Sequence, residues 1–121
     1  MSDVVCRWIR HSGSDQESQG VPPHCAEFGK VWRDHGALAF RECVADDVKV
    51  GKWTSFPRSV KLKRGETVVW SYIVYKSRAH RDRVNAKVMK DPRMTSIMNP
   101  KALPFDGKRM IFGGFKVLVE G

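Results

Sequence analysis

The sequence predicts an α+β domain, in which helices cover one face of an antiparallel sheet. Three observations predict it. The run Thr67–Tyr75 is almost continuously apolar and rich in β-branched and aromatic residues, as is typical of a strand inside a sheet. A charged segment with helical spacing follows at Arg78–Lys90, and a further strand is expected at Lys108–Val119. At 121 residues the chain is expected to form a single domain, 1–121, around one core.

The recognisable pattern of elements begins at Ala26. The segment Ala26–His35 reads as the end of a helix, because its apolar residues recur at helical spacing. Gly36 then stands where a left-handed helix cap is expected. Ala37–Val44 is predicted to be a strand, and Val48–Pro57 to be a loop.

The centre of the chain reads as a hairpin. Ser59–Lys63 and Glu66–Lys76 flank Arg64 and Gly65, which are expected to form the turn. The second arm is apolar in both of its alternating sets, so we expect both of its faces to be covered.

The remaining elements carry clear boundary signals. Ser77 is a natural N-cap for the helix Arg78–Lys90, and the residue before Pro92 avoids helical geometry, so the helix ends there. A short helical turn is expected at Arg93–Met98, and a bend or bulge at Gly113-Gly114 in the last strand. The order helix, strand, strand, helix, strand is that of a ferredoxin-like βαββαβ unit lacking only its opening strand.

Several motifs in this part of the chain are distinctive, and they carry a resemblance to a known family. The motifs are Phe56-Pro57-Arg58, Gly65–Val69, Arg81–Met89, Asp91-Pro92-Arg93 and Pro104–Phe115. Together they resemble the YbaA-like family of small bacterial proteins of unknown function, over Ala26 to Glu120. The resemblance implies a dimeric α+β barrel, in which two ferredoxin-like sheets pack face to face across a two-fold axis. It implies no established activity.

Residues 1–25 depart from the family pattern. The family opens with a strand of approximate sequence Tyr-Val-Asp-Gly-Phe-Val-Val-x-Val-Pro, followed by a helix containing Ala-Tyr-Arg. Codons for Cys6–Cys25 can be chosen that, read from the second base, encode Val-Asp-Gly-Phe-Val-Ile-Pro-Val-Pro-Thr-Lys-Asn-Arg-Lys-Ala-Tyr-Arg-His-Ile. Because each shifted codon can reach only a few residues, so long a match indicates a frame-shifted segment, restored near Ala26. The alternative is a divergent N-terminus, in which the alternating Val4, Cys6 and Trp8 supply a substitute strand.

Composition limits the classes of protein. No apolar run approaches the roughly 18 residues that span a bilayer, and the opening residues lack a secretory signal. Three scattered cysteines make neither a disulfide framework nor a zinc site, so we expect a cytoplasmic protein without metal or cofactor. The net charge of +9 invites a nucleic-acid interpretation, but no recognition motif accompanies the basic stretch Lys61–Lys90, and a solvated helix face is favoured.

The sequence says least about catalytic or ligand-binding residues. His11 and His24 lie in the atypical segment, His35 reads as a helix-end residue, His80 as solvated, and Cys43 as a small buried side chain. Asp106 is expected to cap the turn that leads into the last strand. The candidate ligand-cavity residues are Trp53, Phe56, Trp70, Tyr72, Met89 and Arg109.

Three functions stay open. The fold suggests small-molecule binding or turnover in a cavity between sheet and helices, which is an argument from fold alone. The alternatives are a basic RNA-associated module and a protein that acts only through homodimerisation. A sheet-facing cavity with a convergent arginine or histidine favours the first. A continuous basic stripe flanked by exposed tyrosine or tryptophan favours the second.

Overall fold

The computed structural model describes residues 1–10, 23–97 and 107–120. Within these ranges, four strands and four α-helices follow one another, with a short 3-10 helix at Gly107–Arg109. In chain order they are β1 (Ser2–Arg10), α1 (Pro23–Asp34), β2 (Ala39–Val44), α2 (Phe56–Ser59), β3 (Glu66–Val74), α3 (Arg78–Lys90), α4 (Pro92–Ile97) and β4 (Ile111–Phe115).

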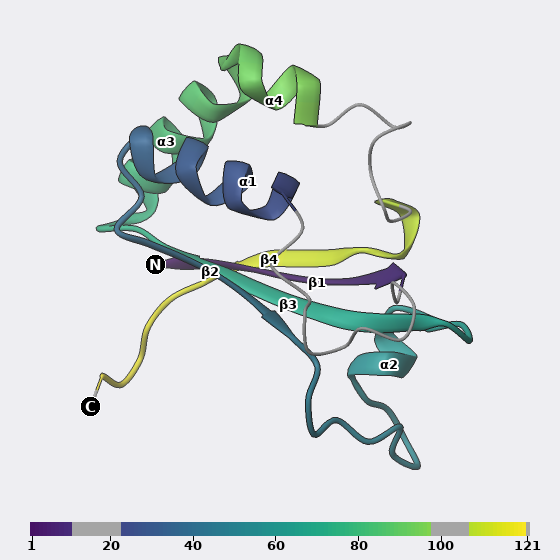
Figure 1. Cartoon of the computed structure of the whole chain (residues 1–121). Helices are drawn as coiled ribbons and strands as arrows, with labels where there is room; N and C mark the ends of the chain where they lie inside the picture. The colour runs from purple at the N-terminus through teal and green to yellow at the C-terminus, as the bar shows by residue number, and fades with distance from the viewer. Residues whose placement is uncertain (11–22, 98–106, 121) are drawn as a thin grey trace.

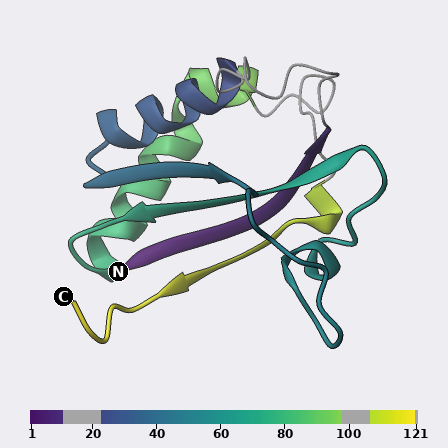
Figure 2. The ribbon, with the colours of Figure 1, turned by 60° about the horizontal axis from the view of Figure 1, so that its bottom comes forward.

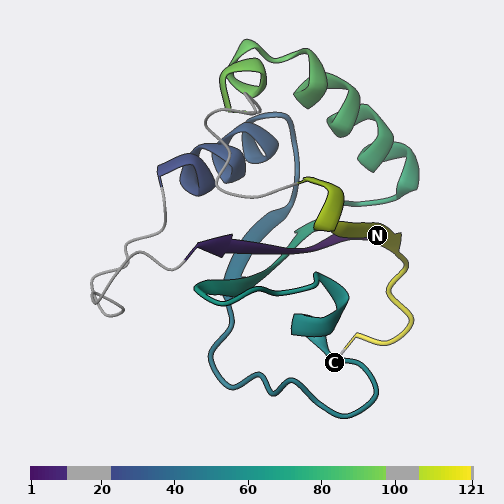
Figure 3. The same ribbon diagram turned by 90° about the vertical axis from the view of Figure 1, so that its right-hand side faces the viewer.

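The strands form one sheet in the order β2-β3-β1-β4, and every neighbouring pair is antiparallel (Figure 2). Helices α1, α3 and α4 lie on one face of this sheet (Figure 1). The short helix α2 and the loop before it lie on the opposite face (Figure 3). We call the first face the helix-covered face and the second the open face.

Strand β1 lies inside the sheet, between β3 and β4. This is the position of the opening strand that the pattern from Ala26 onward lacks. Residues Ser2–Arg10 of β1 pair with β3, and Ser2–Cys6 also pair with β4. The substitute strand expected from the alternation of Val4 and Cys6 is therefore confirmed for this polypeptide. Because strand side chains alternate between faces, Asp3, Val5 and Arg7 point to the helices.

Local signals place several boundaries where they were predicted. Ser77 Oγ accepts the backbone N–H of His80 at 3.1 Å, and α3 runs over Arg78–Lys90 as expected. Gly36 has a φ of +113°, the left-handed geometry that favours glycine after a helix. β3 lies between β2 and β1, so its predicted central place is confirmed.

Two local predictions were wrong. Ser59–Lys63 forms no strand: Ser55 caps the short helix α2 by accepting the backbone N–H of Arg58 at 3.2 Å, and the chain then turns through Lys61 at φ 51°. Strand β4 is shorter than Lys108–Val119 and has no bulge, since Gly113 and Gly114 pair one-to-one with Val4 and Asp3.

Two apolar clusters hold the layers together. The larger lies between the sheet and the helices and contains Val31, Ala37, Ile73, Tyr75, Val84, Val88 and Met94. The smaller lies on the open face under α2 and contains Cys6, Val60 and Val68. The two alternating sets of β3 thus enter different clusters, which explains why almost every position of that strand is apolar.

Candidate ligand cavity

A cavity of about 400 Å³ lies between the helix-covered face of the sheet and helices α1, α3 and α4. Pockets of about 300–1,000 Å³ are the usual size of small-molecule sites. Its walls are mainly aromatic and methionine side chains, and they include Phe28, Trp32, Phe40, Met89, Met94 and Phe112. The rings of Trp32 and Phe40 lie 6.1 Å apart, tilted by 32°.

The floor of the cavity carries a polar group from three adjacent strands. Arg7 on β1 forms an ion pair with Glu42 on β2, and Arg7 Nη1 donates to Ser71 Oγ on β3 at 3.0 Å. Glu42 and Ser71 are directly opposite each other in the β2–β3 ladder. All three residues line the cavity, and Arg7 is only 5% exposed. A convergent arginine, the feature that favours the small-molecule hypothesis, is therefore present.

One oxygen of this floor stands out. Glu42 Oε1 accepts from Arg7, whereas Glu42 Oε2 is buried and has no hydrogen-bond partner among the described residues. A buried acceptor without a partner costs roughly 1–3 kcal/mol. Either an ordered water molecule or a ligand donor can complete the hydrogen bonding of such a group.

A second polar network closes another part of the cavity wall. Asp3 accepts hydrogen bonds from Arg81 at 3.0 Å, from Asn85 at 3.3 Å and from the Tyr75 hydroxyl at 3.2 Å. Burial, followed by the charge of Asp3, raises the pKa of Tyr75 well above its usual range, so the hydroxyl stays protonated and donates. Trp32 Nε1 donates to Asn85 Oδ1 at 3.3 Å. This network joins α1, α3 and β1.

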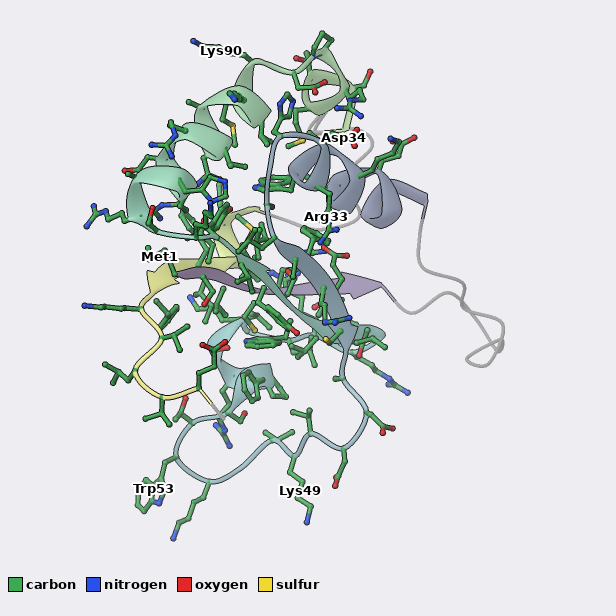
Figure 4. The ribbon with its side chains drawn as sticks, turned by 90° about the vertical axis from the view of Figure 1, so that its left-hand side faces the viewer. Met1, Arg33, Asp34, Lys49, Trp53 and Lys90 are labelled. Atoms are coloured by element: carbon green, nitrogen blue, oxygen red, sulfur yellow. The ribbon has the colours of Figure 1, made fainter. Side chains whose placement is uncertain are left out.

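Of the six candidate residues named from the sequence, Met89 lines this cavity. Trp70 and Tyr72 lie on the open face, with their rings 5.4 Å apart. Trp53 is 85% exposed at the end of the loop before α2, where Figure 4 shows it pointing away from the molecule, and Phe56 is 52% exposed beside it. Arg109 forms a two-pronged ion pair with Glu66.

Sequence reasoning did not single out Glu42 or Ser71. Glu42 follows Phe40 by two positions on β2, and Ser71 interrupts the apolar set Val69–Ile73 on β3. A polar residue within an inward-facing apolar set is the signal that could have identified both. This signal could not be recognised from the sequence, because the sequences of β2 and β3 do not reveal which of their two alternating sets of side chains faces the helices.

The reactive side chains outside the cavity also differ in part from expectation. Cys43 is exposed, because β2 is an edge strand and Cys43 lies on its open face; the prediction that it is buried was wrong. His80 is half-buried, and its Nδ1 accepts the backbone N–H of Lys76 at 3.0 Å. His35 lies at the end of α1 as expected, and its Nε2 is 2.7 Å from Asp91 Oδ2. Asp106 lies outside the described residues.

Within residues 1–10, 23–97 and 107–120, no group of three or more histidine, cysteine or acidic side chains could hold a metal ion. In the same ranges, no helix combines the length and the apolar character needed to cross a membrane.

Comparison with known proteins adds a family but no activity. Residues 15–107 match the family described as protein of unknown function DUF1428. Similar chains include the uncharacterized protein YbaA of Escherichia coli strain K12, 44% identical over 95 residues that cover 78% of this chain and 80% of the relative. The uncharacterized protein YbaA of Shigella flexneri is similar to the same extent.

Proposed function

Because the chain belongs to the DUF1428 family of proteins of unknown function, we propose a role based on its own geometry, namely that it binds a small molecule in the cavity between sheet and helices. The observation that carries the proposal is the polar floor of Arg7, Glu42 and Ser71 beneath an apolar wall. A few convergent polar groups in a mainly apolar pocket are typical of ligand sites, since the wall supplies affinity and the polar groups fix orientation.

The proposal depends on residues from most of the chain. Glu42 and Ser71 are contributed by β2 and β3, and Trp32 and Met89 by α1 and α3. All four lie beyond Ala26, outside the segment whose reading frame is in question. The N-terminal strand contributes Asp3, Val5 and Arg7 to the lining, and of the polar floor only Arg7 comes from that segment.

The test is native mass spectrometry of the protein purified from its own host, in parallel with a cavity-filling variant. We expect the wild-type chain to retain a small molecule, and Ser71→Leu to lose it because the larger side chain enters the cavity from the floor. Ser96→Leu makes the same change on an exposed position of α4 and should retain the ligand. Equal retention by both variants would place the ligand elsewhere and overturn the proposal.

We propose further that the domain is a ferredoxin-like unit of a dimeric α+β barrel. The strand order β2-β3-β1-β4, with α1 and α3 on one face, supports this assignment. The open face supports the dimer: Trp70, Tyr72 and Val74 are only half-buried there, and Ile111 and Phe115 are 48% and 56% exposed. Apolar side chains that cover one face of a sheet normally pack against a second layer.

A further inference from the structure

The charges around the cavity indicate that its ligand is neutral. Arg7 pairs with Glu42, and Arg81 pairs with Asp3, so each cation among the described residues that line the cavity has an acidic partner. An ionised ligand would add a charge without a partner to this apolar space, which is unfavourable because the charge loses its hydration. A neutral molecule avoids that cost.

The unpartnered oxygen indicates which polar group the ligand carries. Glu42 Oε2 is an acceptor, so the ligand group that it can bind is an O–H or N–H donor. Ser71 Oγ lies on the neighbouring strand and already accepts from Arg7 at 3.0 Å, which leaves its own hydroxyl hydrogen to be donated. A hydroxyl group both donates and accepts, so it satisfies this pair of side chains at one point.

The wall indicates the body of the ligand. Trp32, Phe40 and Phe112 present aromatic rings, and Met89 and Met94 present thioethers, which pack well against rings. At about 400 Å³ the cavity is suited to a body of one or two rings rather than to a long chain.

We infer that the cavity takes a neutral aromatic molecule with a hydroxyl group, which donates to Glu42 Oε2 and accepts from Ser71. The inference rests on the proposed function and goes beyond it by naming the ligand class and the two anchoring residues. Both anchors lie outside the atypical N-terminal segment.

The experiment compares three probes by isothermal titration calorimetry: 2-naphthol, naphthalene and 2-naphthoate. They share one aromatic body and differ in the hydroxyl group and the charge. We expect 2-naphthol to bind about tenfold more tightly than naphthalene, since its hydroxyl group donates to a buried carboxylate, and hydrogen bonds to ionised groups are stronger than those between neutral groups. The negatively charged 2-naphthoate should bind more weakly than both.

Variants locate the hydroxyl group. Ser71→Ala and Glu42→Gln should each reduce the preference for 2-naphthol several-fold while leaving the affinity for naphthalene within about twofold. Ser96→Ala and Glu27→Gln are matched changes at exposed positions and should retain the full preference. If Glu42→Gln fails to fold because Arg7 loses its partner, Ser71→Ala carries the test alone, since it removes only a hydroxyl group.

The possible outcomes distinguish a failure of the inferred ligand class from a failure of the proposed cavity function. If naphthalene and 2-naphthol bind equally, and the cavity-filling Ser71→Leu abolishes both, the cavity is a binding site but the hydroxyl anchor is wrong. Tighter binding of 2-naphthoate would overturn the assignment of a neutral ligand. If no probe binds to the wild-type chain, or if Ser71→Leu binds them all unchanged, the anchor and the proposed cavity function both fail.

Discussion

Arg109 holds Glu66 in a two-pronged ion pair: Nη1 donates to Oε1 and Nη2 to Oε2, both at 2.8 Å. The same Nη1 donates to the backbone oxygen of Lys61 at 2.9 Å. The two side chains are only 12% and 8% exposed. The pair therefore fastens the 3-10 helix before β4 to the start of β3.

Arg109→Lys should destabilise the fold although it keeps the charge. A lysine ammonium cannot reproduce the planar fork that meets both carboxylate oxygens. We expect a loss of about 1–3 kcal/mol in the free energy of unfolding, measured by urea denaturation. Arg83→Lys, at an exposed position of α3, should stay within about 0.5 kcal/mol of wild type. Equal stability of the two variants would contradict the structural role of the fork.

Stability should fall in acid in a way that depends on Asp91. Hydrogen bonds from Arg93, then the contact with His35, lower the pKa of Asp91 below its ordinary value of 3.8. A carboxylate with a lowered folded-state pKa stabilises the fold fully above its unfolded-state pKa, and that contribution is lost as the pH falls through the folded-state value. We expect melting temperatures to fall below about pH 4.

The variant Asp91→Asn should flatten this acid limb, because the amide takes up no proton in that range. The measurement is the difference in melting temperature between variant and wild type, from neutral pH down to about pH 2.5. Asp47→Asn, in the exposed loop after β2, is the control and should leave the profile unchanged. If the melting temperature of Asp91→Asn falls in acid as steeply as that of the wild type, Asp91 does not contribute to the acid sensitivity.

The sequence predicted the elements whose boundaries are local. Ser77 and Pro92 bracket α3 through a side-chain cap and a backbone restriction, and both act within a few residues. The hairpin predicted at Arg64-Gly65 failed for a similar local reason. The cap formed by Ser55 diverts the preceding segment into a helical turn, and this competes with extension.

The cavity could not be predicted to the same degree, because its floor joins residues far apart in the sequence. Arg7 and Ser71 meet only when β1 and β3 pair, and Glu42 joins them only when β2 pairs with β3. The sequence suggests Trp70 and Tyr72 as lining residues, whereas the structure places both on the open face. Their alternating set faces away from the helices, which the sequence does not reveal when both sets of a strand are apolar.

The frame-shift hypothesis can be tested on the native protein. Intact mass, or resequencing of the coding DNA across residues 3–26, should show the shifted segment in place of Cys6–Cys25. In the shifted frame, the aspartate of Val-Asp-Gly stands four residues after Asp3. If the shifted segment forms β1 with its residues moved four positions toward the N-terminus, this aspartate takes the place of Asp3 and meets Arg81 and Asn85. Four is an even number, so every side chain keeps its face. Peptides that match Trp8 to Cys25 in native protein would sink the idea.

The same shift places isoleucine at the position of Arg7. Glu42 would then lose its ion pair, while its unpartnered oxygen and Ser71 remain on the floor. We expect a recombinant chain with the restored frame to bind 2-naphthol less tightly, because Glu42 would be a buried carboxylate without a cation to balance it. Unchanged binding by the restored chain would show that Arg7 does not contribute to the site.

Assembly should occur through the open face. The inward set of β3 is already covered by helices, since Val69, Ile73 and Tyr75 are at most 7% exposed. The outward set is therefore the one left for a partner, and the chain after β4, with Leu118 90% exposed, leaves on the same side (Figures 1 and 3). We expect light scattering to report a two-fold dimer at micromolar concentration.

A pair of glutamate variants separates the two faces. Ile111→Glu lies on the open face and should give a folded monomer. Val44→Glu changes a comparably exposed side chain on the helix-covered face and should stay dimeric. A wild-type monomer at micromolar concentration would defeat the prediction, as would loss of the dimer in both variants alike.

The last prediction concerns the basic charge. On α3, Arg78, Arg83 and Lys87 are exposed, but no aromatic residue of this helix accompanies them to stack on bases. A surface that tracks phosphates binds tightly at low salt, and its affinity collapses as salt rises, with a slope set by the number of phosphates contacted. We expect only weak binding of RNA and DNA, because these cations alternate with Asp82 and Asn85 and serve to solvate the helix.

The measurement is a filter-binding titration with single- and double-stranded RNA at two salt concentrations. A triple variant, Arg78→Glu with Arg83→Glu and Lys87→Glu, should leave both the circular dichroism spectrum and the oligomeric state unchanged, because none of the three side chains enters the buried clusters. Submicromolar affinity at physiological salt, lost in the triple variant, would reverse the assignment. In that case α3 would be a nucleic-acid surface, and the cavity would have to be considered separately from it.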